Sequence, residues 1–517
     1  MQEAKKLHAH IIINGFQQQE TYLRKLITFF AISNPSSLNY ARLIFDQIQH
    51  KSTFIYNTMI RAYSSSCNPR NSFILYNQMH RNGRPSVDKY TFPFLLKACS
   101  VLGDIRKGEE THCQVVKNGF SSDIFVQNSL IHFYGSNAKI SSARLVFDET
   151  FERDVATWTT LVSCYANHGS IETACKLFKE MPEKSVVSFS AMITGCVRKG
   201  RFSEALEFFR ELQIRGLEPN DSTVMGVISA SANLGSLDTG KWIHSYIRNK
   251  KGNRLDSSMN TALIDMYFKC GSIKDAIHVF EGVKVKLVGE WTAMISGMAM
   301  HGFGERSVEL FENMVEYGVK PNAITFVGLL SGCTHAGLVE EGLMYFKRMK
   351  SEFGIEPTIE YFGCVVDLLG RAGLIELAVT FMNNMPMKAN AAVWGAILNA
   401  CRVHKNVEVG ELVARWLLRE EPRNAAIYMS LLSLYTEANR WDDVAMVKRE
   451  MKEIGSRKSP GCSLVEVNGV SYEFVAGDKS YPPALQVSLQ IDESIKEVKE
   501  DYSSFACAAD NGFRSHT

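Results

Sequence analysis

The sequence predicts an all-α fold, an α-α superhelical solenoid of stacked helical hairpins, followed by a small C-terminal extension that contains a β-hairpin. Three observations support this fold. One short motif recurs about every 31 to 36 residues, a second motif follows most copies fifteen residues later, and Gly-centred turns separate the two. The first motif reads NTMIRAY from Asn57, NSLIHFY from Asn128, TTLVSCYANHG from Thr159, SAMITGCVRKGR from Ser190, TALIDMYFKCG from Thr261 and TAMISGMAMHG from Thr292.

The second motif has the pattern of an amphipathic helix. In ALEFFREL, which starts at Ala205, the apolar residues fall on one stripe at helical spacing. Turns such as Lys199-Gly200-Arg201 and Cys270-Gly271-Ser272 lie between the two motifs of a unit. A single hairpin cannot bury such a stripe, so neighbouring units must stack on one another.

Taking Asn57 as the fifth residue of its unit divides the chain in order. Residues 1–19 form a partial repeat, because they match the second half of a later unit and lack the composition of a transit peptide. Residues 391–455 continue as helical repeats, and residues 501–517 form a polar, aperiodic tail that we expect to be disordered. Between them, residues 456–500 open with two short strands around an Asn468-Gly469 turn. The array itself spans 20–390, with units at 20–52, 53–88, 89–123, 124–154, 155–185, 186–220, 221–256, 257–287, 288–322, 323–358 and 359–390.

Composition excludes several classes of protein. Lys and Arg number 57 against 55 acidic residues, so no overall basic charge points to nucleic acid, and any such function must come from local placement. The twelve Cys include no Cys-x-x-Cys pair, which removes the usual zinc and redox motifs. We expect Cys99, Cys333 and Cys401 to be small buried residues. No apolar run approaches the ~18 residues that a membrane span requires.

No catalytic motif is present. The chain has no P-loop, no Gly-x-Ser-x-Gly and no His-Glu-x-x-His. Acidic pairs such as Glu340-Glu341 and Asp442-Asp443 are typical of solvated helix faces. We therefore expect no enzyme activity, no metal and no cofactor.

The unit lengths alternate in a recurring order, and at this point the chain resembles the plant pentatricopeptide repeat proteins of the PLS class. The resemblance covers nearly the whole chain. Motifs that carry it are TFPFLLKAC from Thr91, ALIDMYFKCGSI from Ala262, ITFVGLLSGCTHAGLVEEGL from Ile324 and CVVDLLGRAGLIELA from Cys364.

The C-terminal part resembles the family's E/E+ subgroup. Residues 391–455 look like its two extension repeats, and SPGCSLVEVNGVSYEFVAGDKSYP from Ser459 is similar to its PG box, with Leu464 in place of the usual Trp. In longer members this box opens a deaminase domain, which needs a His-x-Glu and a Cys-x-x-Cys for zinc. No His here has Glu two residues on, and Cys507 is the one Cys after the box segment, so the resemblance implies an incomplete domain without catalysis.

The resemblance implies that the fifth and last residues of a unit read one RNA base. By this rule the two Asn-Asp pairs favour U, and the Ser-Asn and Thr-Asn pairs favour A. Units 53–88 to 288–322 then face the RNA 5′-UNUNANNA-3′, in which N marks a unit without an assigned base. The pairs Thr159 with Ser185 and Thr261 with Leu287 are half-legible, because Thr hints at a purine while Leu287 offers no hydrogen bond. Alternatively, the fifth residues are helix N-caps. The readable pairs are Asn57 with Asp88, Asn128 with Asp154, Ser190 with Asn220, and Thr292 with Asn322.

Three cations share the thirteenth place of their units: Arg198, Lys269 and Arg371. They are candidates for phosphate contacts, and a solvated helix end explains them equally well.

The resemblance implies a site-recognition factor for organellar C-to-U RNA editing that binds single-stranded RNA and recruits a DYW-type deaminase in trans, with multiple-site editing factors as further partners. We expect the mitochondrion, with the chloroplast as the alternative. Two other functions stay open, an RNA-binding protein for transcript stability or splicing, and a protein-interaction scaffold of the tetratricopeptide kind.

Overall fold

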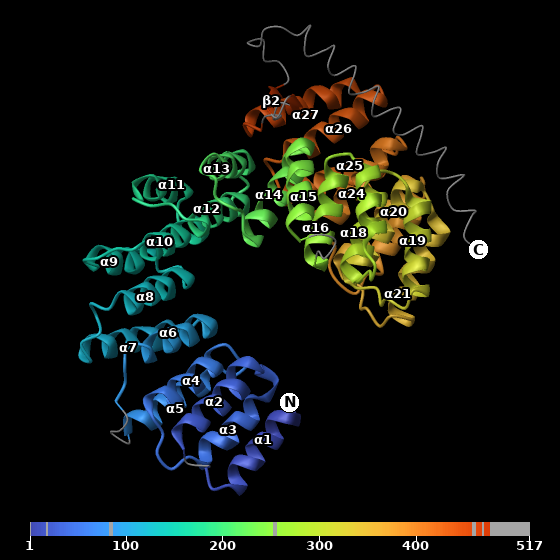
Figure 1. Ribbon diagram of the computed structural model, residues 1–517. Helices are drawn as coiled ribbons and strands as arrows, with labels where there is room; N and C mark the ends of the chain where they lie inside the picture. The colour runs from blue at the N-terminus through green and yellow to red at the C-terminus, as the bar shows by residue number, and fades with distance from the viewer. Residues whose placement is uncertain are drawn as a thin grey trace. The chain divides into compact units, whose positions relative to one another are not determined.

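The computed structural model describes residues 2–16, 19–81, 86–251, 256–456, 462–467 and 470–475. These residues are almost entirely helical, and the helices follow one another as hairpins (Figure 1). The chain divides into two compact bodies, residues 1–226 and 227–517, which are described separately.

The N-terminal body begins with a single helix and continues with hairpins. Its last helix crosses the boundary between the two bodies. Its elements are α1 (Gln2–Ile13), α2 (Glu20–Thr28), a π-helical turn η1 (Phe29–Ser33), a 3-10 turn η2 (Pro35–Ser37), α3 (Leu38–Gln47), α4 (Thr53–Ser64), α5 (Arg70–Arg81), α6 (Thr91–Leu102), α7 (Ile105–Lys117), α8 (Ile124–Ser136), α9 (Ile140–Glu149), α10 (Val155–His168), α11 (Ile171–Glu180), α12 (Val186–Arg198), α13 (Phe202–Ile214) and α14 (Asp221–Leu234).

The C-terminal body continues in the same manner and ends with a pair of strands. Its elements are α15 (Leu237–Lys251), α16 (Ser257–Lys269), α17 (Ile273–Gly282), α18 (Val288–Met300), α19 (Gly304–Glu316), α20 (Ala323–Ala336), α21 (Val339–Ser351), α22 (Ile359–Arg371), α23 (Ile375–Asn383), α24 (Ala391–Val403), α25 (Val407–Glu420), α26 (Ala425–Glu437), α27 (Trp441–Glu453), β1 (Cys462–Val467) and β2 (Val470–Val475).

The turns within hairpins are made by glycines in the left-handed conformation. Gly200 has φ 73° and Gly271 has φ 78°, a region that other residues adopt only under strain. Each follows the C-cap residue of the first helix of its hairpin, Lys199 or Cys270, as a C-terminal stop. Both predicted turns are therefore confirmed.

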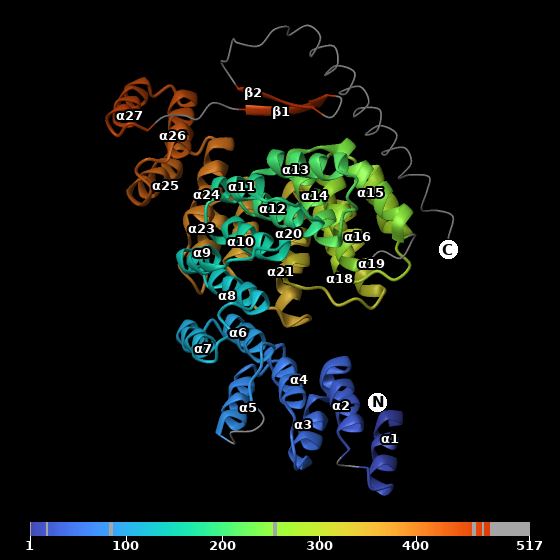
Figure 2. The same cartoon turned by 60° about the vertical axis from the view of Figure 1, so that its left-hand side comes forward.

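The first helices of successive hairpins pack against one another within each body. In the N-terminal body α8, α10 and α12 lie side by side, each with its second helix alongside (Figure 2). In the C-terminal body α16, α18, α20, α22 and α24 form the same row. The predicted fold class, a solenoid of stacked helical hairpins, is confirmed.

The apolar stripes of the helices fill the spaces between hairpins. Phe209 is 2% exposed and Leu212 is fully buried, which is the stripe that the sequence predicts. The cysteines Cys99, Cys333 and Cys401 are buried as predicted, and burial raises the pKa of the Cys99 thiol to about 12.

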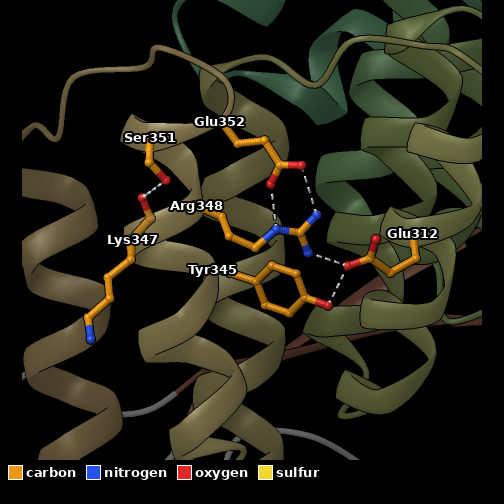
Figure 3. Close-up of polar contacts among 6 residues, drawn as sticks. All are labelled: Glu312, Tyr345, Lys347, Arg348, Ser351 and Glu352. Atoms are coloured by element: carbon orange, nitrogen blue, oxygen red, sulfur yellow. Dashed lines mark hydrogen bonds and ion pairs between the residues drawn. The ribbon is translucent and has the colours of Figure 1, made fainter.

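Ion pairs link the outer, second helices of neighbouring units. Arg348 on α21 donates through Nη1 to Glu312 Oε1 on α19 at 2.6 Å and through Nε to Glu352 at 2.6 Å (Figure 3). The hydroxyl of Tyr345 donates to the same Glu312 oxygen at 2.8 Å, and Ser351 Oγ donates to its own helix, to the carbonyl of Lys347 (Figure 3). Hydrogen bonds from Arg348 to both carboxylates raise the pKa of its guanidinium, which therefore stays charged in this link.

Two short strands follow the last hairpin, where the sequence predicts strands. β1 pairs with β2 in antiparallel register, with Cys462 opposite Val475 and Val467 opposite Val470. The predicted turn at Asn468-Gly469, the remainder of the segment 456–500 and the predicted disordered tail 501–517 lie outside the described residues. In the part of the chain that is described, no helix is both long and apolar enough to cross a membrane.

Candidate functional site

The predicted reading residues occupy the first helices of their hairpins. Asn57 lies on α4, Asn128 on α8, Ser190 on α12 and Thr292 on α18, each in the second turn. All four were predicted to lie on first helices, and that placement is confirmed. Their approach to a common groove stays a prediction.

The last residue of a unit caps the next first helix. Asp154 Oδ1 accepts from the amide of Thr157 at 2.7 Å, and Asn322 Oδ1 accepts from the amide of Thr325 at 2.9 Å. The alternative that the fifth residue is the cap is wrong, because α8 is capped by Asp123, five residues before Asn128. Capping fixes the orientation of the last side chain, since one of its oxygens must stay on the helix end.

The Asn-Asp pairs are in direct contact. Asn57 Nδ2 donates to Asp88 Oδ1 at 2.8 Å, and Asn128 Nδ2 donates to Asp154 Oδ1 at 3.4 Å. Burial raises the pKa of Asp154, but the hydrogen bonds from Thr157 and Asn128 outweigh that effect and keep it below its ordinary value. The Asp154 carboxylate is therefore ionised at neutral pH and acts as an acceptor only.

The pairs that end in Asn meet through hydroxyl groups. Ser190 Oγ donates to Asn220 Oδ1 at 2.9 Å. The hydroxyl of Thr292 lies 2.7 Å from that of Thr325, which donates to Asn322 Oδ1 at 3.0 Å. Each predicted pair is thus joined, two through a single bond to Asp, one through a single bond to Asn and one through an intervening threonine.

In three readable pairs, those that end in Asp88, Asn220 and Asn322, the bonds to the last residue converge on one side-chain atom and leave the other without a partner among the described residues. Asn220 and Asn322 use Oδ1 for the cap, so Nδ2 keeps two free hydrogens among the described residues. Asp88 likewise uses Oδ1 for the amides of Tyr90 and Thr91, and its Oδ2 makes no hydrogen bond to any described residue. The free atom is a donor at the two Asn positions and an acceptor at Asp88.

The half-legible pairs are not joined. Ser185 Oγ accepts from the amide of Ser188 as a cap, and no bond links it to Thr159. Leu287 has no polar side-chain atom, and no bond joins it to Thr261. The sequence predicted this deficiency for Leu287 and not for Ser185.

Within the described ranges, several buried polar atoms without a partner lie at this level of the repeats, while others, on Tyr76, Ser231 and Tyr435, lie elsewhere. Among the described residues such atoms include Asn128 Oδ1, Thr159 Oγ1 and Glu290 Oε1, two on fifth residues and one at the end of α18 that follows Leu287. An unpaired buried polar atom costs free energy unless a ligand or water satisfies it. These atoms indicate a surface that is completed by a polar partner.

Two further sets of residues at fixed register were not predicted from the sequence. The first is a hydroxyl residue three places after the last residue of five units, which bonds to the cap; it could have been found from its spacing alone. The second is an exposed apolar residue three places before the fifth residue. The first set is Thr91, Thr157, Ser188, Thr223 and Thr325, all fully buried; the second is Phe54, Tyr90, Phe125, Val187 and Ile324.

The three candidate phosphate contacts are already engaged. Arg198 Nη1 donates to Asn167 Oδ1 at 2.9 Å. Lys269 and Arg371 form ion pairs with acids one turn earlier on their own helices, Asp265 at 2.8 Å and Asp367 at 3.0 Å. Because Asp265 and Asp367 cancel their charge locally, Lys269 and Arg371 present little net positive potential to a phosphate.

A cavity of about 410 Å³ lies at the last unit of the array. It is lined by Gly363, which is the fifth residue there, and by Asn390, whose Oδ1 caps α24 through the amide of Val393. The missing side chain at Gly363 leaves the space open, since an added Cβ would meet only Val393 at 3.7 Å. In the described part of the chain, no group of three or more His, Cys, Asp or Glu side chains is arranged to hold a metal ion.

Comparisons with known proteins agree with this architecture. A model described as "E motif" matches residues 404–466. Models described as "PPR repeat family" and "PPR repeat" match six segments, namely 51–101, 184–233 and 288–335 for the first and 156–186, 261–286 and 324–352 for the second.

Two Arabidopsis thaliana proteins are similar over most of their length. Pentatricopeptide repeat-containing protein At5g66520 is 48% identical over 483 residues, 93% of this chain and 77% of the relative. Pentatricopeptide repeat-containing protein At1g59720, chloroplastic/mitochondrial, is 38% identical over 515 residues, 96% of this chain and 76% of the relative. The crystal structure of the maize pentatricopeptide repeat protein PPR10 superimposes with a TM-score of 0.49 and 16% identity, over 88% of this chain and 72% of that one. On the similarity to the Arabidopsis relatives and the matches of the repeat models, the chain belongs to the pentatricopeptide repeat protein family.

Proposed function

We propose that the protein binds single-stranded RNA by sequence and acts as a site-recognition factor for organellar C-to-U editing, with the deaminase supplied in trans. The RNA proposal rests on how the last residue of a readable unit uses the two polar atoms of its side chain. One atom is fixed on the helix end, and the other is left free at a defined position.

The free atom matches the chemistry of the expected base. A free amide at Asn220 or Asn322 donates a hydrogen bond, which suits N1 of adenine. A free carboxylate oxygen at Asp88 accepts one, which suits N3–H of uracil. The base preferences expected for these pairs therefore have a physical basis in which atom the cap has already used.

The exposed apolar residues beside the pairs supply the second element of base binding. Tyr90 and Phe125 stand with ring centroids 6.1 Å apart, and Phe54 is 44% exposed. Exposed aromatic and aliphatic side chains give flat surfaces on which bases stack, at ~1 to 3 kcal/mol per base for aromatic stacking. Stacking holds each base while the polar pair reads its edge.

The editing role is supported by the E motif over residues 404–466, because this motif is the part of the chain that a base-reading array alone does not need. Relatives carry the names "chloroplastic/mitochondrial" and "mitochondrial", and we propose the mitochondrion as the site of action. The base-reading residues and the unit boundaries given above are part of the same proposal.

The reading rule is tested at Asn220. Replacing Asn220 by Asp keeps the capping oxygen and turns the free donor into an acceptor, so the preferred base facing this unit should change from A to G. We expect the affinity for the A-containing RNA to fall by ~1 to 3 kcal/mol, the scale of one good base-edge contact. The measurement is an electrophoretic shift with 5′-UNUNANNA-3′ and with 5′-UNUNGNNA-3′, in which the A that faces unit 186–220 is replaced by G.

Asn406→Asp is the matched control, because Asn406 caps the second helix α25 in the same way but belongs to no reading pair. It should leave both affinities unchanged. Equal binding of the two RNAs by the Asn220→Asp variant would count against the reading rule.

The editing role is tested with a partner that contains a complete deaminase domain. The purified chain should convert no cytidine, and adding the partner should restore conversion, because the array holds the target at high effective concentration. Deleting Ser459 to Thr517 should abolish conversion with little change in RNA affinity. Sequencing organellar transcripts from a null plant decides between editing and transcript stability, since unedited cytidines are expected in the first case alone.

A further inference from the structure

The junction between units 257–287 and 288–322 departs from the other junctions at three neighbouring places. Leu287 stands where most others have Asp, Asn or Ser, Gly289 stands where five others have an exposed apolar residue, and Glu290 stands where five others have a buried Ser or Thr. Each departure changes the surroundings of Thr261, the fifth residue of the unit. Together they alter what this unit presents to a base.

Glu290 accepts from the amide of Leu287, as the hydroxyl of Thr325 accepts from the amide of Asn322 at the next junction. Its Oε2 accepts from the amide of Leu287 at 3.1 Å, so one carboxylate oxygen is fixed on the end of α18. Its Oε1 has no partner among the described residues, although the residue is only 1% exposed. The same pattern appears in three readable pairs, where one atom of the last side chain caps the helix and the other is free.

The carboxylate occupies the place that faces the fifth residue. At the equivalent place Thr223 lies 2.6 Å from the fifth residue Ser190, hydroxyl to hydroxyl. Glu290 therefore replaces a hydroxyl that contacts the reading residue by a carboxylate oxygen that lacks a donor. A buried acceptor of this kind is stabilised only when a donor reaches it.

Gly289 lets the start of α18 pack closely against Thr261. An added Cβ at Gly289 would stand 2.6 Å from Thr261 Oγ1, so no side chain fits between them. A cavity of about 540 Å³ lies beside Glu290 and is lined by Leu287 and Glu290, together with Arg248 and Lys284, while Thr261 and Gly289 are not part of its lining. It combines the free carboxylate with two cations, and is large enough for a nucleotide.

We infer that Glu290, rather than residue 287, reads the base that faces unit 257–287, and that this base is guanine. The inference rests on the proposed RNA-binding function and assigns one further specificity residue to it. Guanine presents two adjacent donors, N1–H and the N2 amino group, to a carboxylate. Uracil presents one donor, while adenine and cytosine place a ring acceptor beside their amino group, which repels a carboxylate. Arg248 and Lys284 supply positive charge for the phosphate of the same nucleotide.

The test compares RNAs of sequence 5′-UNUNANGA-3′ with A, U or C in place of the G. The wild-type chain should bind the G-containing RNA about tenfold more tightly than the A-containing one. In Glu290→Gln the amide oxygen can keep the bond to Leu287 while the amide nitrogen donates, so the preference should reverse towards A. Glu290→Thr, which introduces the residue found at four other junctions, should lose the preference altogether. Thermal unfolding of each variant confirms that it is folded.

Discrimination of A from G at the nucleotide facing Ser190 and Asn220 is measured with the same proteins as the internal standard. If the wild-type chain discriminates there but is indifferent at the nucleotide facing Thr261, or prefers another base, the inference about Glu290 is wrong and the proposed function stands. If the G preference survives in Glu290→Gln, Glu290 is not its source. Absence of discrimination at both nucleotides would overturn the proposed function, and this inference with it.

Discussion

At the scale of single residues, histidines on second helices are paired with tyrosines of the following first helix. His112 Nδ1 lies 2.9 Å from the hydroxyl of Tyr134, and His244 Nδ1 lies 2.8 Å from that of Tyr267. Burial lowers the pKa of both imidazoles from the ordinary value of 6.5, and for His244 the neighbouring Arg248 lowers it further. Both rings are neutral in the folded protein at neutral pH.

These pairs predict a loss of stability in mild acid. Because the pKa of each histidine is lower in the folded state than in the unfolded state, the unfolded chain binds protons more readily as the pH falls below about 6.5. The free energy of unfolding should be constant between pH 7 and 8 and should fall towards pH 5. Chemical unfolding at each pH measures this.

The variant with His112→Gln and His244→Gln keeps a polar partner for each tyrosine and removes the titrating groups. Its free energy of unfolding should depend less on pH than that of the wild type. Identical slopes for the two proteins would show that other groups cause the loss.

At the scale of elements, the distance between helices is set where glycines face a neighbouring backbone. An added Cβ at Gly304, at the start of α19, would lie 2.3 Å from the carbonyl oxygen of Gly332 on α20. A backbone carbonyl cannot move aside as a flexible side chain can. Gly304→Ala should therefore force α19 away from α20 and lower the free energy of unfolding by about 2 kcal/mol.

Gly395 provides the opposite case on α24. Nothing lies within 4 Å of an added Cβ there, so Gly395→Ala should stabilise the protein by up to ~1 kcal/mol through helix propensity. Thermal unfolding of the two variants beside the wild type measures both effects: the midpoint temperature should fall for Gly304→Ala and rise for Gly395→Ala. A neutral Gly304→Ala would mean that the two helices separate without cost.

Elements were more predictable than contacts. The recurrence of the first motif was sufficient to place Asn57, Asn128 and Ser190 on first helices, because helical periodicity and glycine turns are local properties of the chain. The sequence could not show that Asn220 uses its oxygen and keeps its amide hydrogens free, since that depends on a cap and a hydroxyl thirty residues away. The side chain of Leu287 offers no hydrogen bond, as the sequence predicts, but the Glu three residues later was a local signal for a bond to the Leu287 amide.

The sequence also contains the spacing of two ion pairs within helices. Asp367 precedes Arg371, and Asp265 precedes Lys269, by four residues on a helix, which is the spacing of an ion pair. Two of the three candidate phosphate contacts could therefore have been recognised as paired.

At the scale of the whole molecule, the charge balance predicts how RNA binding depends on salt. The net charge is +2, and Lys269 and Arg371 are neutralised by their own helices. For single strands the slope of log affinity against log salt is about −0.7 for each phosphate neutralised. With no more than about three such contacts, we expect a slope no steeper than about −2.

Filter binding of 5′-UNUNANNA-3′ across a series of KCl concentrations measures this slope. A scrambled RNA of equal length should bind more weakly at every salt concentration and show a similar slope, because the phosphates are shared and the bases differ. A slope several times steeper would show that the backbone, and not the base edges, dominates recognition.

The cap shared between neighbouring units limits how much information a unit can encode. Once the end of the next helix has taken one oxygen, the last side chain can only donate, as Asn220 does, or accept, as Asp88 does. The last residue can therefore distinguish only two classes of base, those that accept and those that donate a hydrogen bond at the contacted atom. Distinguishing four bases needs two such choices. The second must come from the fifth residue, which is Asn in one unit (Asn57) and Ser in another (Ser190). Under the proposed reading rule both positions are therefore needed. A unit whose fifth residue offers no hydrogen bond, such as Pro93 in unit 89–123, is expected to act as a spacer unless another side chain takes over, as we infer for Glu290.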